Sequence, residues 1–149
     1  MQRFKFRLES VLRVREAVEQ KLLGELADTR RVLEIHKNRL VSLQTQSHDT
    51  LRTAADLRQK QPEPHREGSL QRYVLALDED IANQHAVIHE AELVVESKLA
   101  EVIKAMQDRK SLENIKEKHQ EAHRLLELKE ETKSLDDFAS IRKSRTTVS

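Results

Sequence analysis

A repeat of about 3.5 residues runs through the second half of the chain and constrains its fold more than any other feature. Between Ser69 and Phe138 the sequence contains neither proline nor glycine. Stepping alternately by four and three residues from Leu77 to Leu126 meets fifteen positions, of which nine are apolar. The residues between them are mostly Glu, Lys, Gln and Arg. This pattern is typical of a long helix whose apolar seam lies against a partner helix.

The composition argues against a globular fold with several packed layers. Charged residues make up 36% of the chain, and the aromatic residues are three Phe and one Tyr. A disordered chain can be similarly charged, but here the apolar residues are periodic, which favours helices. The net charge of +1 gives no general attraction to nucleic acid. The lack of cysteine, of a signal sequence and of an apolar run of about 20 residues favours a soluble, intracellular protein without membrane insertion.

Residues 4–58 are predicted to form the first helix. Its apolar stripe consists of Leu8, Val11, Leu12, Val18, Leu22, Leu26, Leu33, Leu40, Leu43, Leu51 and Leu57. Gly24 lies inside this helix, where glycine costs about 1 kcal/mol relative to alanine; a tolerated defect is favoured over a hinge. The seam is expected to weaken around Thr50 and Ala54.

Residues 59–69 form the predicted break between the helices. Pro62 and Pro64 remove backbone donors and disfavour helical geometry in the residues before them. Gly68 permits a turn, and Ser69 is a good N-cap for a second helix at about 70–138, followed by a polar tail at 139–149. Two long amphipathic helices joined in this way fold back on each other. The predicted fold class is therefore all-α: a single domain formed by a long two-helix antiparallel coiled-coil hairpin, with the second helix longer than the first.

The end of the second helix is predicted to extend past the first. The hairpin places Phe4 opposite His123 or Arg124, so the following residues have no partner within the chain. The extension carries Leu125, Leu126, Leu128, Leu135 and Phe138. Such unpartnered apolar residues favour an external partner over fraying.

All three Phe residues lie near the chain ends, among several Arg residues. Aromatic side chains ringed by Arg are typical of protein-binding hot spots. Packing of Phe4 and Phe6 at the end of the coiled coil is an equally supported interpretation. A second patch around Tyr73, near the break, is more simply explained by packing.

The sequence offers no pattern typical of catalysis or of a bound cofactor. Two histidine pairs, His85 with His89 and His119 with His123, have the i, i+4 spacing of metal ligands, but no third ligand is evident. The two glycines are too far apart for a phosphate-binding loop. We therefore expect a protein that is not an enzyme and that has no cofactor and no metal site.

Three segments resemble the FliJ family of flagellar export proteins. The first is Phe-Lys-Phe-Arg-Leu-Glu-Ser-Val-Leu-Arg-Val-Arg-Glu at residues 4–16. The second is Arg-Lys-Ser-Leu-Glu-Asn-Ile-Lys-Glu at 109–117, and the third is Lys-Ser-Leu-Asp-Asp-Phe-Ala at 133–139. Their order, the chain length and the central break agree with the family over nearly the whole chain.

The resemblance implies a two-helix coiled coil similar to the central γ stalk of rotary ATPases. Such a protein sits in the hexameric ring of the export ATPase FliI and promotes the assembly and hydrolysis of that ring. It also contacts the export gate protein FlhA and export chaperones, and it lies in the cytoplasm, peripheral to the inner membrane at the flagellar base. By this analogy the chain ends enter the ring, whereas the gate contact lies nearer the break.

The resemblance also implies two sets of contact residues. The candidate ring contacts are Phe4, Phe6, Arg7, Leu8, Arg13, Arg15, Arg109, Lys133, Asp136 and Phe138. The candidate gate contacts are Leu43, Tyr73, Leu77 and Ile81. Gln46 and Thr50 stand where some relatives carry aromatic residues, so the gate surface departs from the family pattern.

Three alternatives stay open at this point. The related stalk proteins of virulence type III secretion share the expected fold. A self-associating structural coiled coil would pair its extension with a second copy. A basic coiled coil that binds nucleic acid through its N-terminal segment is disfavoured by the near-zero net charge.

Overall fold

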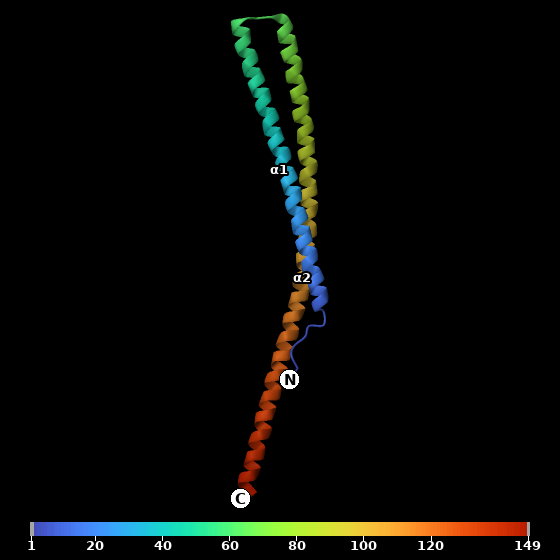
Figure 1. Ribbon diagram of the computed structural model, residues 1–149, viewed down its shortest axis with the longest axis vertical. Helices are drawn as coiled ribbons and strands as arrows, with labels where there is room; N and C mark the ends of the chain where they lie inside the picture. Colours follow the sequence, from blue (N-terminus) through green and yellow to red (C-terminus); the bar gives the residue numbers. More distant parts are fainter. Residues whose placement is uncertain (1, 149) are drawn as a thin grey trace. The chain divides into compact units, whose positions relative to one another are not determined.

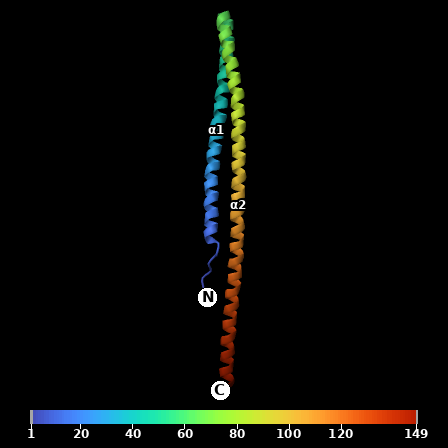
Figure 2. The same cartoon turned by 90° about the vertical axis from the view of Figure 1, so that its right-hand side faces the viewer.

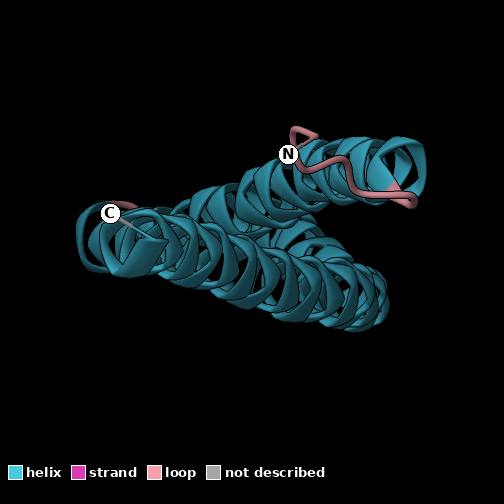
Figure 3. Cartoon of the chain, turned by 90° about the horizontal axis from the view of Figure 1, so that it is seen from below, coloured by secondary structure: helices cyan, strands magenta, loops and turns pink. Residues whose placement is uncertain are grey.

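The computed structural model describes residues 2–148, and this part of the chain contains two helices joined by residues 61–63. The first, α1, spans Glu9–Lys60, and the second, α2, spans Pro64–Val148. They pack against each other as a helical hairpin, and α2 is the longer (Figure 1). Figure 3 shows only helix and loop, with no strand within residues 2–148. The predicted all-α hairpin is confirmed.

The chain divides into two compact units, each built from parts of both helices. Unit 1 consists of Met1–Glu19 and Lys104–Ser149, and unit 2 consists of Gln20–Ile103. Figures 1 and 2 show the same chain from two sides.

The helices of unit 2 meet along a seam with alternating steps of three and four residues. On α1 every seam residue is buried or half-buried: Leu22, Leu26, Thr29, Leu33, His36, Leu40, Leu43, Ser47, Thr50, Ala54 and Leu57. On α2 the same holds for Leu70, Val74, Leu77, Ile81, Gln84, Ile88, Ala91, Val95, Lys98 and Val102. The repeat predicted for the second helix is therefore confirmed in this unit, because each of its positions faces the seam.

The predicted stripe of the first helix was wrong at three positions. Val11, Val18 and Leu51 are exposed side chains that lie outside the seam. Thr50 and Ala54, which the sequence suggested as weak points, are seam residues, and Ala54 is buried. A continuous heptad places Ala54 on the same face as Leu26. Leu51 follows the seam residue Thr50 by one position, which turns it about 100° around the helix from the seam.

A buried polar residue interrupts the apolar seam of unit 2. Gln84 is buried, and its Nε2 donates a hydrogen bond of 2.9 Å to the backbone carbonyl oxygen of His36. A buried amide without such a partner would carry a large desolvation cost. The bond therefore makes Gln84 compatible with burial and favours one register of the two helices.

The connection between the helices is shorter than predicted. We expected a loop at 59–69, but α1 continues to Lys60 and α2 begins at Pro64. Proline is well suited to the first position of a helix, where its missing N–H is not needed. Gly68 and Ser69 consequently lie inside α2, and no glycine has a positive φ in the part of the chain described. The Ser69 hydroxyl donates to the carbonyl oxygen of His65 at 3.3 Å and does not cap a helix.

Side chains of α2 close the end of α1. Arg66 donates hydrogen bonds to the backbone carbonyl oxygens of Gln61 and, at 3.5 Å, Leu57. Arg58 forms an ion pair of 2.7 Å with Glu67. The last carbonyl groups of a helix have no partner within that helix, so these contacts allow a very short connection.

The far end of α2 also differs from the prediction. Residues 139–149 were expected to be a polar tail, but the helix continues through Val148. No proline or glycine follows Gly68 to stop it. The helix therefore includes the basic residues Arg142, Lys143 and Arg145.

Replacing Gly24 with alanine should stabilise the hairpin by about 1 kcal/mol, because alanine is the better helix former. A Cβ atom at this position would meet no heavy atom within 4 Å. The measurement is the free energy of unfolding from urea denaturation. A destabilised variant would show instead that the helix requires a glycine here, as the less favoured hinge interpretation holds.

An ion pair crosses the seam of unit 2 between Glu25 and Lys98. Lys98 Nζ lies 2.9 Å from Glu25 Oε2 and 2.9 Å from Glu101 Oε2. The hydrogen bond from Lys98, and then its charge, lower the pKa of Glu25. The hydrogen bonds that Lys98 donates to Glu101 and Glu25 raise the pKa of Lys98.

The lowered pKa of Glu25 gives a pH dependence with a defined sign. A carboxyl group with a lowered pKa stabilises the fold above its unfolded pKa of about 4.3, and the contribution is lost as the pH falls through the folded pKa. We expect Glu25→Gln to be slightly less stable than the wild type at pH 7 and equally stable at pH 2. Thermal unfolding at both pH values measures this; an equal deficit at both would contradict it.

Candidate protein-interaction site

Unit 1 holds most of the residues that the sequence marked as a contact site. The first helix was expected to begin at residue 4, but residues 2–8 are not helical; they precede α1 as an N-terminal segment that lies against α2. The Phe4 ring is 5.5 Å from the His123 ring, and the Phe6 ring is 5.9 Å from the His119 ring in an edge-on arrangement. His123 Nε2 lies 3.1 Å from the carbonyl oxygen of Gln2. The expected pairing of Phe4 with His123 is confirmed.

These contacts favour the packing interpretation for Phe6. Its side chain is buried, whereas Phe4 and Leu8 are half-buried. The segment turns into α1 through a hydrogen bond of 3.2 Å from the Glu9 N–H to the Phe6 carbonyl oxygen. A buried Phe6 offers no surface to a partner, so its role lies in attaching the N-terminal segment to α2.

His119 and His123 each lie against a phenylalanine ring. Within residues 2–148 no group of three or more His, Cys, Asp or Glu residues is arranged to hold a metal ion.

The candidate contact Arg109 is also engaged inside unit 1. It forms ion pairs with Glu19 and, at 2.8 Å, with Glu113. The hydrogen bonds that Arg109 donates to Glu19 and Glu113 raise the pKa of Arg109. Glu19 is buried in the seam, and removing its partner would leave a poorly solvated carboxylate. Arg109 therefore holds the two helices together, and its guanidinium is already paired with carboxylates of the same chain.

Sequence reasoning overlooked Glu19 because only apolar residues were counted in the first helix. The missing signal was the spacing, since Glu19 stands seven residues after Leu12 and seven before Leu26. A charged residue in that register requires an opposite charge on the facing helix, and the second-helix seam contains Arg109 and Lys116. Lys116 Nζ indeed lies 2.9 Å from Glu9 Oε2.

The remaining basic candidates near the N-terminus are more accessible. Arg7 and Arg13 are exposed. Arg15 is exposed as well, and its Nη1 lies 3.4 Å from Asp108 Oδ2. Together with Phe4 they form the accessible part of the predicted N-terminal contact surface.

The other candidates lie on a stretch of α2, residues 124–146, whose side chains are exposed except for the half-buried Glu127. We call this stretch the terminal extension. Lys133, Asp136 and Phe138 are all exposed there. Phe138 stands fifteen residues beyond His123, which corresponds to about 22 Å along a helix. The three Phe residues therefore do not form one cluster, although all belong to unit 1.

The apolar residues of the terminal extension do not continue the seam. Continuing the seam from Leu126 meets Glu130, Lys133, Asp137 and Ser140, all of which are polar. The apolar side chains lie on another face of the helix and have the spacing Leu125, Leu128, Leu135 and Phe138. We call these four residues the extension face. Leu135 is 69% exposed and Phe138 is 67% exposed.

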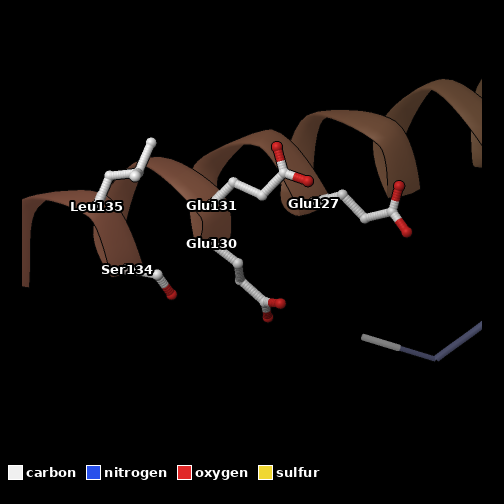
Figure 4. A pocket seen from close by; sticks show the side chains of 5 residues that line it. All are labelled: Glu127, Glu130, Glu131, Ser134 and Leu135. Carbon is white, nitrogen blue, oxygen red and sulfur yellow. The ribbon is translucent and has the colours of Figure 1, made fainter. Parts of the chain in front are cut away.

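Carboxylates stand beside the extension face. Figure 4 shows Glu131 and Leu135 pointing to one side of α2, and Glu130 and Ser134 pointing to the other. Glu127, Glu130 and Glu131 line an open hollow with Ser134 and Leu135. Because all five side chains come from one helix, the hollow has no opposite wall and offers no enclosed site for chemistry.

The candidate gate contacts lie in unit 2 and are mostly inaccessible. Leu43 and Leu77 are buried, and Ile81 is half-buried in the seam. Tyr73 is exposed. Only Tyr73 among the four offers a side chain to a partner without separating the helices.

Among the described residues, neither helix has a stretch that is apolar enough over a sufficient length to cross a membrane. A family model described as flagellar FliJ protein matches residues 4–147. No curated protein and no solved structure matches the chain. Because the family match covers nearly the whole sequence, the chain belongs to the FliJ family of flagellar proteins.

Proposed function

We propose that this chain is the central stalk of a flagellar export ATPase and that its terminal extension contacts the ATPase ring. Family membership implies a stalk protein related to flagellar export. The proposal adds three points to family membership. The protein contacts the ATPase ring, it promotes ring assembly and ATP hydrolysis, and it lies peripheral to the inner membrane. The protein would act by binding, without a reaction of its own.

The observation that carries the proposal is the extension face. An exposed apolar stripe on a single helix is costly in water, and a partner that encloses the helix would remove that cost. A ring with a central opening is such a partner. The exposed Lys133 and Asp136 lie near the stripe and could form the polar rim of the contact.

The N-terminal surface supports a second part of the same contact. Arg7 and Arg13 are exposed, and the half-buried Phe4 stands three residues before Arg7. Phe6 is buried, and Arg109 is held by Glu19 and Glu113 within unit 1. We therefore limit the proposed ring contacts to Phe4, Arg7, Arg13, Arg15 and the extension.

Co-elution with the purified export ATPase tests the proposal. The full chain should elute with the ATPase, and a chain lacking residues 125–149 should not. Circular dichroism checks that the shortened chain stays helical. Co-elution of a helical shortened chain would show that the ATPase binds elsewhere on the protein.

The export gate and export chaperones are further proposed partners, with Tyr73 as the anchor for the gate. Tyrosine is enriched in interface hot spots, and Tyr73 is exposed near the short connection. We expect Tyr73→Ala to weaken binding to the cytoplasmic part of the gate while leaving ATPase binding unchanged. Unchanged gate binding would remove Tyr73 from the proposal.

A further inference from the structure

Unit 2 carries an apolar groove that neither the ring contact nor the gate contact uses. It lies between α1 and α2 and has a volume of about 420 Å³. Its lining residues are Asp28, Thr29, Val32 and His36 of α1, and Val87, Glu90, Ala91 and Val94 of α2. We call these residues the valine groove.

The three valines of the groove are unusual for their positions. They stand beside the seam, where two-helix coiled coils generally carry charged residues. Val32 is 48% exposed, Val87 is 40% exposed and Val94 is 52% exposed. Leucine or valine at such positions gains little from the hairpin itself, so these residues suggest a third element that packs on the groove.

Charged residues bound the apolar surface along both helices. On α1, Glu25 stands seven residues before Val32 and Arg39 stands seven residues after it. On α2, Asp80 stands seven residues before Val87 and Glu101 stands seven residues after Val94. The apolar part is therefore limited to the two turns between Val87 and Val94, about 10 Å along the helix. This length suits a short amphipathic helix with apolar residues at i, i+4 and i+7.

The rim of the groove is acidic. Asp28 stands on the α1 side and Glu90 on the α2 side, and both are exposed. Asp28 forms an exposed ion pair of 3.2 Å with Arg31. Exposed pairs of this kind contribute little and can exchange for a partner's charge. A partner with basic residues on each side of its apolar stripe would place them next to Asp28 and Glu90.

We propose that the valine groove is a docking site for an amphipathic helix of another protein whose apolar stripe is flanked by Lys or Arg. The valines supply the apolar contact, and the two carboxylates select a basic partner. The terminal extension plays no part in this contact. The proposal is thus independent of the ring contact and stands or falls separately from it.

Fluorescence anisotropy with a synthetic peptide tests the proposal on the full chain. The probe is a labelled helical peptide with Leu at i, i+4 and i+7 and Lys at the flanking positions. We expect saturable binding that weakens as salt rises. A second peptide with Glu in place of the flanking Lys should bind about tenfold more weakly or not at all.

Variants locate the peptide on the protein. Val94→Asp should weaken binding by about tenfold or more, because it places a charge in the apolar contact. Val41→Asp is the matched control, since Val41 is an exposed valine on α1 that does not line the groove. Glu90→Lys should weaken binding of the Lys peptide and strengthen binding of the Glu peptide. The Glu90→Lys substitution leaves the apolar surface unchanged, so it still tests the proposal if the Val94→Asp variant does not fold.

Three results would overturn the proposal. The first is the absence of saturable binding to the wild-type chain. The second is equal binding of the two peptides. The third is an equal loss of peptide binding in the folded Val94→Asp and Val41→Asp variants. If the chain instead forms dimers that only Val94→Asp disrupts, the groove takes a second copy and not a basic helix.

Discussion

Replacing both Leu135 and Phe138 with aspartate should weaken binding to the export ATPase by about 100-fold or more. Each residue is an exposed apolar side chain of the extension face. Burying an aspartate in an apolar contact is costly, and two hot-spot positions together can account for most of the affinity of an interface. The measurement is the dissociation constant for the ATPase, obtained by titration at constant salt.

The matched control for this prediction is Ser140→Asp. Ser140 is exposed and stands two residues after Phe138, which places it on the opposite side of the helix. We expect it to bind like the wild type. Both variants should also unfold at the wild-type temperature, because residues 128–146 are all exposed. Equal binding by the double variant and the control would show that the extension face does not contact the ATPase.

Leu26→Ala should destabilise the hairpin by about 2–3 kcal/mol. Leu26 is 4% exposed and lies in the seam of unit 2. Truncating a buried leucine removes its transfer free energy and leaves a cavity that the surrounding side chains fill only in part. The measurement is the free energy of unfolding by urea denaturation, with the slope of the transition compared between variants.

The same substitution at Leu51 provides the control within the same helix and unit. Leu51 is 53% exposed, so we expect Leu51→Ala to change the free energy of unfolding by no more than about 0.5 kcal/mol. Equal losses at the two positions would place Leu51 in the seam and would contradict the heptad register described above.

The sequence predicted the seam of the second helix well because its residues recur at a strict period. From Leu77 to Lys116 every predicted position is buried or half-buried. The first helix was predicted less well. Its outer face carries Val11, Val18 and Leu51, which resemble seam residues in type, while its seam contains polar Glu19 and His36. Residue type alone cannot separate these two faces, but the seven-residue spacing can.

The helix ends were harder to predict than the helices. Pro64 and Gly68 are usually taken as helix breakers, but proline is tolerated at the first helical position. Gly68 is helical and half-buried in α2. Similarly, the polar composition after Phe138 suggested a tail, although nothing in the sequence stops the helix before Val148.

The candidate ring contacts were predicted as one set, but the structure separates them by what they touch. Arg109 and Phe6 looked like free anchors because their partners, Glu19 and His119, are distant in the sequence. Phe138 has an apolar neighbour at Leu135 on the same exposed face. The register of the hairpin decides which side chains remain available to bind a partner protein. The identity of one residue gives no information on that register.

The rate of ATP hydrolysis by the export ATPase, with and without this protein, tests the proposed function most directly. We expect the full chain to stimulate hydrolysis and the chain lacking residues 125–149 to have no effect. The shortened chain must show the helical circular dichroism of the hairpin for the comparison to hold. Equal stimulation by both chains, or none by either folded chain, would contradict a stalk that acts through its terminal extension.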